Sequence, residues 1–319
     1  MSNNLNVLLI GAGYMGKEYG KILNDLDVQY SVSCRSDSSA VKFKEEIGVM
    51  PISGGIENAL NHIDLIPDAA IVAVNVEFLS STVMALLNYG IKEILVEKPA
   101  GLNKDEILEV YEISKSVGAK VYVAYNRRFY SSTDKALDII SNDGGVSSFN
   151  FEFTEWGFQI EKTAHAPEVK ENWLLANSTH VIDLAFFLGG FPKDMYSISS
   201  GSLDWHSRAS KYAGAGVTDN GALFSYQANW DAPGRWAVEV LTNEHRLYFR
   251  PMEKLAIQKK GSVNVENVEI DNQIDIDFKP GLYKQVYAFL FGKNDDRLLT
   301  IEKQIKHLDF YEKIAGIEK

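Results

Sequence analysis

Short apolar runs alternate with segments of helical spacing over the first 125 residues. The runs at residues 5–10 and 69–74 have no polar alternation, which is typical of parallel strands buried on both faces. Residues 14–25 and 78–89 have the spacing of helices, and Gly90 follows the second of them in the usual C-terminal position. Strands separated by helices of this length indicate βαβ units, so we predict a doubly wound parallel sheet.

The pattern changes after residue 125. Phe149, Phe151 and Phe153 alternate with polar residues, which predicts a strand with one buried face. Further strands are predicted at residues 195–203, 222–230, 235–242, 246–250, 254–258 and 263–270, and helices at 133–141, 178–188 and 301–314. We therefore predict an α/β protein with two domains, as its 319 residues suggest. Residues 1–125 form a Rossmann domain, and residues 126–319 form an α+β domain with an open, mostly antiparallel sheet. The boundary near the last helix is soft, because that helix can return to the first domain.

Composition narrows the class of protein. The chain is 45% hydrophobic, which is ordinary for a globular protein. Its net charge of −11 disfavours nucleic acid and anionic membrane as partners. Cys34 is its one cysteine, and residues 1–4 lack the positive start of a signal peptide, so we expect a cytoplasmic protein. The apolar runs are too short to cross a bilayer. The histidines lack a second ligand at metal-binding spacing, and the Asp-rich stretch 271–277 lacks the glycine and final glutamate of a calcium loop. We expect no metal site and interpret that stretch as a solvated strand edge.

A glycine-rich loop directly follows the first predicted strand and opens the first helix. Residues 11–16 spell G-x-G-x-x-G, with Tyr14 and Met15 between the second and third glycines. Gly11 permits a tight turn, Gly13 lets a pyrophosphate approach the backbone, and Gly16 lets helix and strand pack closely. The alternative is a purely structural turn, but the position between a strand and a helix favours a dinucleotide site.

The second predicted strand ends without an acidic residue. An NAD site usually has Asp or Glu there to accept a hydrogen bond from the ribose 2′-hydroxyl. This chain has Arg35 and Ser36 instead, and both suit a 2′-phosphate. We therefore favour NADP over NAD, although Arg35 could also be an ordinary surface residue.

A set of ordered motifs resembles the glucose–fructose oxidoreductase and inositol dehydrogenase (Gfo/Idh/MocA) family. Glu97-Lys98-Pro99 follows the apolar run at residues 94–96, and Asn75 stands where the family chain leaves a strand over the cofactor. The run 125–129 and the His180-x-x-Asp183 segment match two further family positions. The resemblance implies hydride transfer between a nicotinamide and a sugar, sugar nucleotide or related polyol. It also implies a homodimer or homotetramer formed through the open sheet face.

Proton transfer at the reacting oxygen needs an acid or base. By resemblance, Lys98 contacts nicotinamide ribose and substrate hydroxyl and polarises the oxygen, and Glu97 belongs to the cofactor site. His180 is the proton shuttle, since histidine titrates near neutrality, and Asp183 can orient it from the same helix face. Two of these residues have a structural alternative. Lys98 could be an ordinary surface lysine, and His180 could be a core histidine paired with a neighbouring carboxylate.

The chain departs from the family at Ala176, where many members carry an aspartate. Asn177, which follows, can only form hydrogen bonds. This departure keeps open a second function, a catalytically weak or inactive dinucleotide-binding sensor on the same fold.

We expect the substrate to be bound by polar and aromatic side chains. Arginines can bind phosphate or carboxylate, and aromatic faces stack on sugar rings, but the same residues can also form salt bridges or core. The predicted substrate residues are Arg127, Arg128, Trp156, His165, Trp173, Asn177 and Tyr283.

Overall fold

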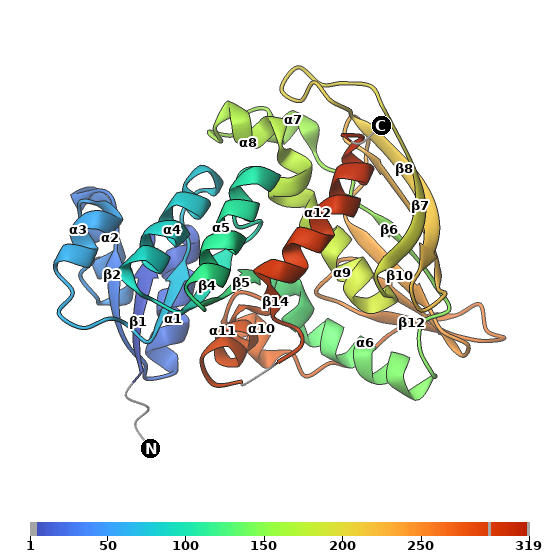
Figure 1. Ribbon diagram of the computed structural model, residues 1–319. Coiled ribbons are helices and arrows are strands. Elements are labelled where there is room, and N and C mark those ends of the chain that lie inside the picture. Colours follow the sequence, from blue (N-terminus) through green and yellow to red (C-terminus); the bar gives the residue numbers. More distant parts are fainter. Residues whose placement is uncertain (1–4, 293–294, 318–319) are drawn as a thin grey trace. The chain divides into compact units, whose positions relative to one another are not determined.

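The computed structural model describes residues 5–292 and 295–317, and the chain divides into two compact units (Figure 1). The first unit contains the chain up to Tyr125 together with Asp277–Lys306, and the second contains Asn126–Ile276 and the chain from His307 onward. The predicted second domain, 126–319, is therefore corrected: residues 277–306 return to the first unit. Residues 1–4, used for the signal-peptide expectation, lie outside the described residues.

The first unit is built on a six-stranded sheet in the order β14-β5-β4-β3-β1-β2. Its strands are β1 (Asn6–Ile10), β2 (Gln29–Ser33), β3 (Ala69–Val72), β4 (Glu93–Glu97), β5 (Lys120–Ala124) and β14 (Leu299–Thr300). The first five are mutually parallel, and β14 is antiparallel to β5. Ile52 forms a parallel bridge with Ser33 on the outer side of β2. With this bridge counted as a third strand, the order becomes the 3-2-1-4-5-6 arrangement of dinucleotide-binding domains.

Helices cover the sheet of the first unit. They are α1 (Tyr14–Asp25), α2 (Asp37–Ile47), α3 (Gly55–Asn61), η1 (Val76–Phe78), α4 (Leu79–Tyr89), α5 (Lys104–Ser116) and α11 (Leu282–Phe291). The apolar faces of α1, α2 and α11 join buried strand residues in one core, which includes Leu282 and Val286 of α11. The sequence did not predict α11. It begins after Gly281, whose positive φ of 71° ends the preceding turn.

The second unit contains an eight-stranded sheet in the order β13-β12-β11-β10-β6-β9-β8-β7. The strands are β6 (Ser148–Glu152), β7 (Pro192–Ser200), β8 (Lys211–Thr218), β9 (Leu223–Asn229), β10 (Ala237–Leu241), β11 (His245–Phe249), β12 (Ala256–Lys259) and β13 (Val265–Asn267). All pairs are antiparallel except β6 with β9. The predicted fold class, a parallel Rossmann sheet followed by an open, mostly antiparallel one, is confirmed.

One face of this second sheet packs against helices. The helical segments of the unit are η2 (Asn126–Phe129), α6 (Ser131–Asn142), α7 (Gly157–Ile160), α8 (Pro167–Glu171), η3 (Leu174–Ser178), α9 (Thr179–Gly189), α10 (Gln273–Asp277) and the last part of α12 (Ile301–Ala315). Phe149 and Phe151 of β6 pack edge-on against Phe186 of α9, so the alternating phenylalanines face the core as predicted.

The Asp-rich stretch is a short helix rather than the predicted strand edge. It forms α10, and the Asp275 carboxylate accepts a hydrogen bond of 2.7 Å from the backbone N–H of Ser131. Ser131 begins α6, whose first N–H groups need partners outside the helix. The Asp275 carboxylate therefore accepts a hydrogen bond from the start of α6. The strand pattern in the sequence could not indicate this role.

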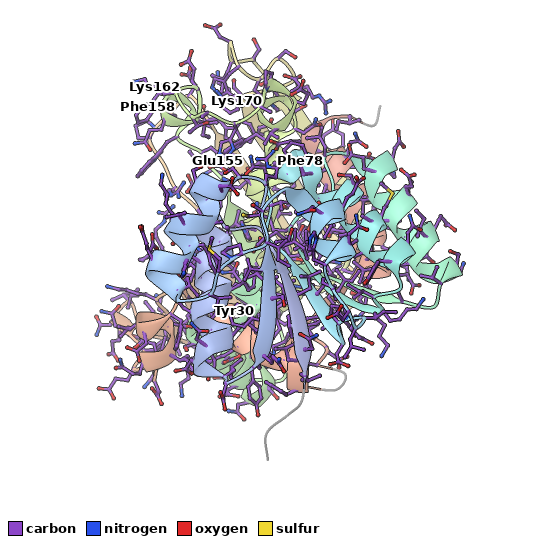
Figure 2. The ribbon with its side chains drawn as sticks, turned by 90° about the vertical axis from the view of Figure 1, so that its left-hand side faces the viewer. Tyr30, Phe78, Glu155, Phe158, Lys162 and Lys170 are labelled. Atoms are coloured by element: carbon purple, nitrogen blue, oxygen red, sulfur yellow. The ribbon has the colours of Figure 1, made fainter. Side chains whose placement is uncertain are left out.

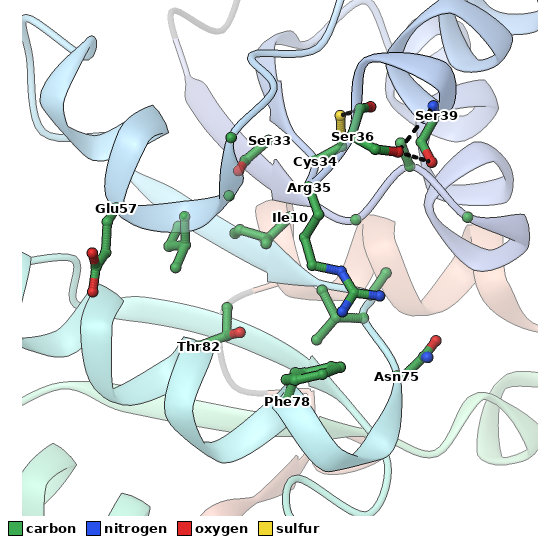
Figure 3. Close-up of a pocket in the computed structure, with 18 of the residues that line it drawn as sticks. Ile10, Ser33, Cys34, Arg35, Ser36, Ser39, Glu57, Asn75, Phe78 and Thr82 are labelled. Atoms are coloured by element: carbon green, nitrogen blue, oxygen red, sulfur yellow. Dashed lines mark hydrogen bonds between the residues drawn. The ribbon is translucent and has the colours of Figure 1, made fainter. Parts of the chain in front are cut away.

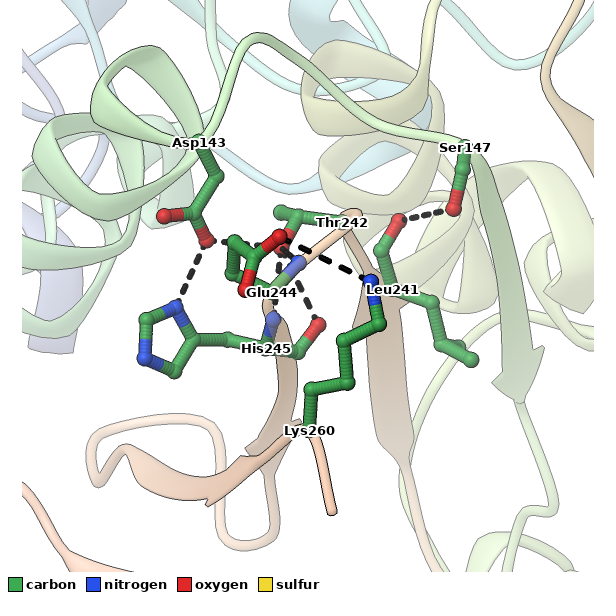
Figure 4. A network of polar contacts seen from close by, with 7 residues as sticks. All are labelled: Asp143, Ser147, Leu241, Thr242, Glu244, His245 and Lys260. Atoms are coloured by element: carbon green, nitrogen blue, oxygen red, sulfur yellow. Dashed lines mark hydrogen bonds and ion pairs between the residues drawn. The ribbon is translucent and has the colours of Figure 1, made fainter.

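A polar network ties the β10–β11 turn to the end of α6 (Figure 4). Asp143 follows α6, and its carboxylate accepts hydrogen bonds from Thr242 Oγ1 (2.6 Å) and from His245 Nδ1 (2.7 Å). The Thr242 hydroxyl also accepts the backbone N–H of His245. Burial disfavours the charged carboxylate, but these hydrogen bonds outweigh it and lower the pKa of Asp143. The network fixes the hairpin turn.

None of the helices in the described parts of the chain combines the length and apolar character needed to cross a membrane.

Candidate functional site

The three glycines of the loop meet different surroundings. A Cβ on Gly11, which has a φ of +113°, would lie 2.2 Å from the carbonyl oxygen of Ala73, and one on Gly16 would lie 1.9 Å from the carbonyl oxygen of Gly11. Nothing lies within 4 Å of the corresponding position at Gly13. Gly11 and Gly16 therefore permit close backbone packing, whereas Gly13 leaves an open approach to the loop.

Helix α1 begins at this loop with uncapped N–H groups. Gly13 occupies the N-cap position without a side-chain hydrogen bond, and the first turn of α1 contains no acidic residue. The free N–H groups and the helix dipole favour an anionic group at this end. Lys279 Nζ lies 5.1 Å from the centre of the Tyr14 ring in the same turn, which adds positive charge nearby. Met15 instead packs against the hydrophobic core.

A cavity of about 740 Å³ opens at the carboxyl ends of β1, β2 and β3 (Figure 3). Five predicted cofactor residues line it: Gly11, Gly13, Arg35, Ser36 and Asn75. The neighbouring strands β2 and β3 lie on opposite sides of β1, so the cavity occupies the point where the strand order reverses. Open α/β sheets bind ligands at this point.

Arg35 and Phe78 form one wall of this cavity. The guanidinium carbon of Arg35 lies 4.6 Å from the centre of the Phe78 ring, and Figure 3 shows the two side chains facing each other. Ser36 caps α2, since its hydroxyl accepts the backbone N–H of Ser39 (3.3 Å). Phe78 was not predicted. Its position six residues after the β3 end, just before α4, is the available signal.

The Glu97-Lys98-Pro99 segment lies at the end of β4. Tyr19 of α1 donates a hydrogen bond of 2.8 Å to Glu97 Oε1, which fixes the strand end against α1. Burial raises the pKa of Glu97, while the Tyr19 hydroxyl and the Lys98 charge oppose this effect. Gln304 donates a hydrogen bond of 3.2 Å to the carbonyl oxygen of Pro99. These contacts hold the turn that carries Lys98, whose side chain is partly buried.

In the second unit, a π-helical turn precedes the helix that carries His180. The turn spans Leu174–Ser178 and includes Ala176 and Asn177, and α9 follows it at Thr179. Single π-turns inside helices are frequent at functional sites. The His180 ring lies 6.1 Å from the Trp236 ring, centre to centre.

Glu155 supplies a carboxylate beside this turn. Its side chain is 2% exposed, and Oε1 accepts hydrogen bonds from Ser178 Oγ (2.8 Å) and Asn177 Nδ2 (3.0 Å). Figure 2 labels Glu155 below Phe158 and Lys162, two exposed residues on the segment that follows. Burial raises the pKa of Glu155, while the Ser178 and Asn177 hydrogen bonds and the Arg235 charge oppose this effect.

Two arginines and two tryptophans form a cluster that contacts this carboxylate through Arg235. Arg235 lies between two indoles, with its guanidinium carbon 4.9 Å from the Trp156 ring centre and 5.0 Å from that of Trp236. Arg127 lies 4.8 Å from the same Trp236 ring. Cation–π contacts of this kind hold guanidinium groups in place. Trp156 is anchored by a hydrogen bond of 2.9 Å from its Nε1 to the carbonyl oxygen of Gly234.

Asp183 pairs with Arg128. Its two carboxylate oxygens accept hydrogen bonds from Arg128 Nη2 (2.5 Å) and Nε (2.7 Å), and His307 Nδ1 lies 3.5 Å away. Burial disfavours its charge, but Arg128 and His307 outweigh this effect and lower the pKa of Asp183. Arg128 is 4% exposed and Asp183 is fully buried. The substrate role of Arg128 stays a prediction, but its guanidinium is engaged by Asp183, which matches the salt-bridge alternative, and Asp183 contacts Arg128 and His307.

The structure gives two further predicted substrate residues contacts of another kind. Tyr283 donates a hydrogen bond of 2.9 Å to Asp25, the last residue of α1, so it lies at the end of that helix away from the glycine loop. Trp173 is 7% exposed and packs edge-on against His165 and Trp205, which makes it part of an aromatic cluster. His165 lies at the exposed rim of this cluster.

The sequence analysis missed Glu155, Arg235 and Trp236. The alternation of Phe149, Phe151 and Phe153 continues to Glu155, which places a carboxylate on the buried face of the strand. Buried carboxylates are rare unless they are paired, so this position carried a usable signal. Among the described residues, no three His, Cys, Asp or Glu side chains are grouped to hold a metal ion.

Comparison with known proteins identifies the first domain. Residues 5–125 match the family described as "Oxidoreductase family, NAD-binding Rossmann fold" (Gfo/Idh/MocA). No curated protein matches the sequence.

Solved structures share the fold over nearly the whole chain. UDP-N-acetylglucosamine 3-dehydrogenase GnnA from Acidithiobacillus ferrooxidans has 13% identity and a TM-score of 0.76, covering 98% of this chain and 97% of that one. Levoglucosan dehydrogenase in complex with NADH has 18% identity and a TM-score of 0.75, covering 98% and 96%. The WlbA dehydrogenase from Bordetella pertussis, in complex with NADH and UDP-GlcNAcA, has 13% identity and a TM-score of 0.75, covering 98% and 96%.

At these identities the structures establish the fold, and the family match establishes the NAD-binding Rossmann domain. The resemblance inferred from the glycine loop and the Glu97-Lys98-Pro99 segment is confirmed, and residues 5–125 match the NAD-binding Rossmann domain of the Gfo/Idh/MocA oxidoreductase family.

Proposed function

We propose that this protein is an NADP-preferring oxidoreductase that transfers a hydride between nicotinamide and a secondary alcohol or ketone of a sugar or sugar nucleotide. The observation that carries the proposal is the cavity at the carboxyl ends of β1–β3, with the open loop at Gly13 and with Arg35 in its wall. This cavity suits a dinucleotide because the α1 N-terminus and the glycine loop border it.

The preference for NADP rests on the residues at the end of β2. Ser33 is the last strand residue, and Cys34, Arg35 and Ser36 follow it around the cavity. A guanidinium can bind a 2′-phosphate through two hydrogen bonds, while a carboxylate in the same place would repel it. Two of the related structures contain NADH, so they do not support a preference for NADP. The proposed preference rests on the residues of this chain.

Lys98 and His180 have the chemical roles that the family resemblance implies. A bound nicotinamide supplies the hydride chemistry. The Lys98 ammonium, at the end of a parallel strand, stabilises negative charge that develops on the substrate oxygen. His180, at the start of α9, gives or takes the proton at that oxygen.

The proposed substrate class draws on the related enzymes and on the second unit. The names of the related structures include a UDP-sugar dehydrogenase and a levoglucosan dehydrogenase. Trp156 is 41% exposed and offers a face for a sugar ring. Arg127 and Asn177 are partly buried and can donate hydrogen bonds to hydroxyl or phosphate oxygens.

An absorbance screen at the nicotinamide band tests the proposal. The purified protein is mixed with NADP⁺ or NAD⁺ and with free sugars, amino sugars, cyclitols or nucleotide sugars, and ketones are tested with reduced cofactor. Turnover with a sugar-type substrate is expected. Cofactor binding without turnover across the panel would contradict the enzyme assignment and favour a dinucleotide-binding sensor.

Replacing Arg35 with alanine is expected to weaken NADPH binding and to leave NADH binding nearly unchanged. A hydrogen bond to a charged group contributes about 1.5–3 kcal/mol, equivalent to roughly 10- to 100-fold in affinity. Fluorescence titration of each cofactor measures the two dissociation constants. Lys44→Ala, an exposed change in the last turn of the helix that Ser36 caps, is the control. Equal losses for NADPH and NADH would rule out the role of Arg35 in cofactor choice.

We propose that the open face of the eight-stranded sheet binds a second copy of the chain. Tyr196, Ile198 and Leu223 are 72%, 55% and 64% exposed, and strand pairing places them on one face. Exposed apolar groups of this kind mark interaction surfaces. Light scattering is expected to give a dimer or tetramer for the wild-type protein and a smaller species for Ile198→Asp. A wild-type monomer would contradict this assembly.

A further inference from the structure

The second unit contains a buried carboxylate beside the position where the family pattern has an aspartate and this chain has Ala176. Position 176, an aspartate in many relatives, is Ala176 here, and it lies inside the π-helical turn before α9. Glu155, three residues after the end of β6, contacts the same turn instead. It is the neighbouring strand segment, therefore, that brings negative charge to the start of the His180 helix.

Both oxygens of this carboxylate have neighbours in the predicted site. Oε1 accepts the hydrogen bonds from Ser178 and Asn177, which stand two and three residues before His180. Oε2 lies 3.7 Å from Nη1 of Arg235. Burying an ionised group is costly unless it is paired and hydrogen-bonded, and Glu155 meets both conditions.

We propose that Glu155 is the positioning residue of the active site, which fixes the Leu174–Ser178 turn ahead of His180 and holds Arg235 between Trp156 and Trp236. This inference rests on the proposed function. Glu155 supplies the carboxylate that the family resemblance would place at position 176. It also fixes the orientation of Arg235 beside the predicted substrate residue Trp156.

The Glu155 carboxylate contacts both the turn before α9 and the Arg235 side chain. The Ser178 side chain is fully buried and immediately precedes Thr179, the first residue of α9. Arg235 is exposed, and cation–π contacts with two indoles limit its motion. Loss of the carboxylate would leave buried donors on Ser178 and Asn177 without this acceptor and would free Arg235 on one side. A shift of about 1 Å at a catalytic group can lower turnover by about 10²-fold.

Kinetics of Glu155→Ala, Glu155→Asp and Glu152→Gln provide the first test. Glu155→Ala is expected to lower kcat by about 10²-fold with an unchanged KM for the cofactor, since the cofactor cavity lies in the other unit. Glu155→Asp, which keeps the charge, is expected to recover part of this loss. Glu152 is the last residue of β6, three residues before Glu155, and pairs with Arg250, so Glu152→Gln is the matched control and should retain wild-type kcat. Wild-type kcat in Glu155→Ala would overturn the proposal.

Hydrogen exchange tests the positioning role without any substrate. In Glu155→Ala, amides of residues 174–182 are expected to exchange at least tenfold faster, while those of the first unit keep wild-type rates. Unchanged exchange at 174–182, or faster exchange throughout the chain, would overturn the proposal in favour of no role or a general structural one. Should the wild-type protein turn over no sugar-type substrate, the proposed function fails, and the exchange result still decides the role of Glu155.

Discussion

Replacing Lys98 with methionine is expected to lower kcat by about 10²- to 10⁴-fold, the range for removal of one charge-stabilising or proton-transferring group. Methionine keeps the length and apolar stem of the side chain and removes the ammonium. The NADPH dissociation constant is expected to change far less, because the cavity at the glycine loop and Arg35 provide most of the proposed cofactor contacts. Stopped-flow or steady-state absorbance at the nicotinamide band measures kcat, and fluorescence titration measures cofactor binding.

The opposite end of the same strand offers a matched control. Lys92 precedes β4, is exposed, and donates a hydrogen bond of 2.8 Å to the carbonyl oxygen of Val117. Parallel strands bind ligands at their carboxyl ends, so Lys92→Met is expected to keep wild-type kcat. A Lys98→Met protein with wild-type kcat would remove Lys98 from the mechanism. Loss of activity together with loss of cofactor binding would instead give Lys98 a binding role.

The Rossmann half was predictable because its local and global signals agree. Apolar runs such as Ala69–Val72 are buried on both faces, and the glycine loop needs its glycines for backbone contact rather than for flexibility alone. The bridge at Ile52 was not predictable, since a single paired residue leaves no periodic pattern. Its effect on the sheet order follows only from tertiary pairing.

The second half contains a strand that its sequence conceals. Strand β8 is rich in alanine and glycine, so hydrophobic alternation does not indicate it. A Cβ on Gly214 would lie 2.4 Å from the Tyr226 ring, and one on Gly216 would lie 2.7 Å from the Phe224 ring. The small residues thus make room for aromatic rings from β9. The small residues of β8 are explained by the aromatic rings of the neighbouring strand β9. The local sequence of β8 therefore could not predict this strand.

The site was predictable only in part for a similar reason. Asp183 and His180 share a helix, and their spacing suggested a pair. Asp183 instead pairs with Arg128, which is 55 residues earlier in the chain. Glu155 carried a local signal, the continuation of the phenylalanine alternation, but its hydrogen bonds to Asn177 and Ser178 depend on tertiary structure.

The pairing of Asp183 leads to the largest expected effect on stability. Asp183→Asn is expected to lower the free energy of unfolding by about 3–5 kcal/mol, because it leaves the buried Arg128 guanidinium without a counter-charge. Arg128 and Asp183 are 4% and 0% exposed, so water cannot replace the lost partner. Urea unfolding followed by circular dichroism measures the change. Glu302→Gln removes an exposed ion-pair carboxylate facing Lys306 and is expected to change stability by only about 0–1 kcal/mol.

The dependence on pH provides an independent check of the same pair. The pKa of Asp183 is lowered in the folded state, so the unfolded chain takes up this proton at a higher pH than the folded one. The stabilisation by Asp183 is therefore present above the ordinary pKa of an aspartate and is lost as the pH falls through the folded value. The stability difference between wild type and Asp183→Asn should shrink over that acid range. A double replacement, Asp183→Leu with Arg128→Met, should be less destabilising than Asp183→Asn alone, since it removes both charges. If Asp183→Asn were as stable as wild type at neutral pH, the buried ion pair would not contribute to the stability of the fold.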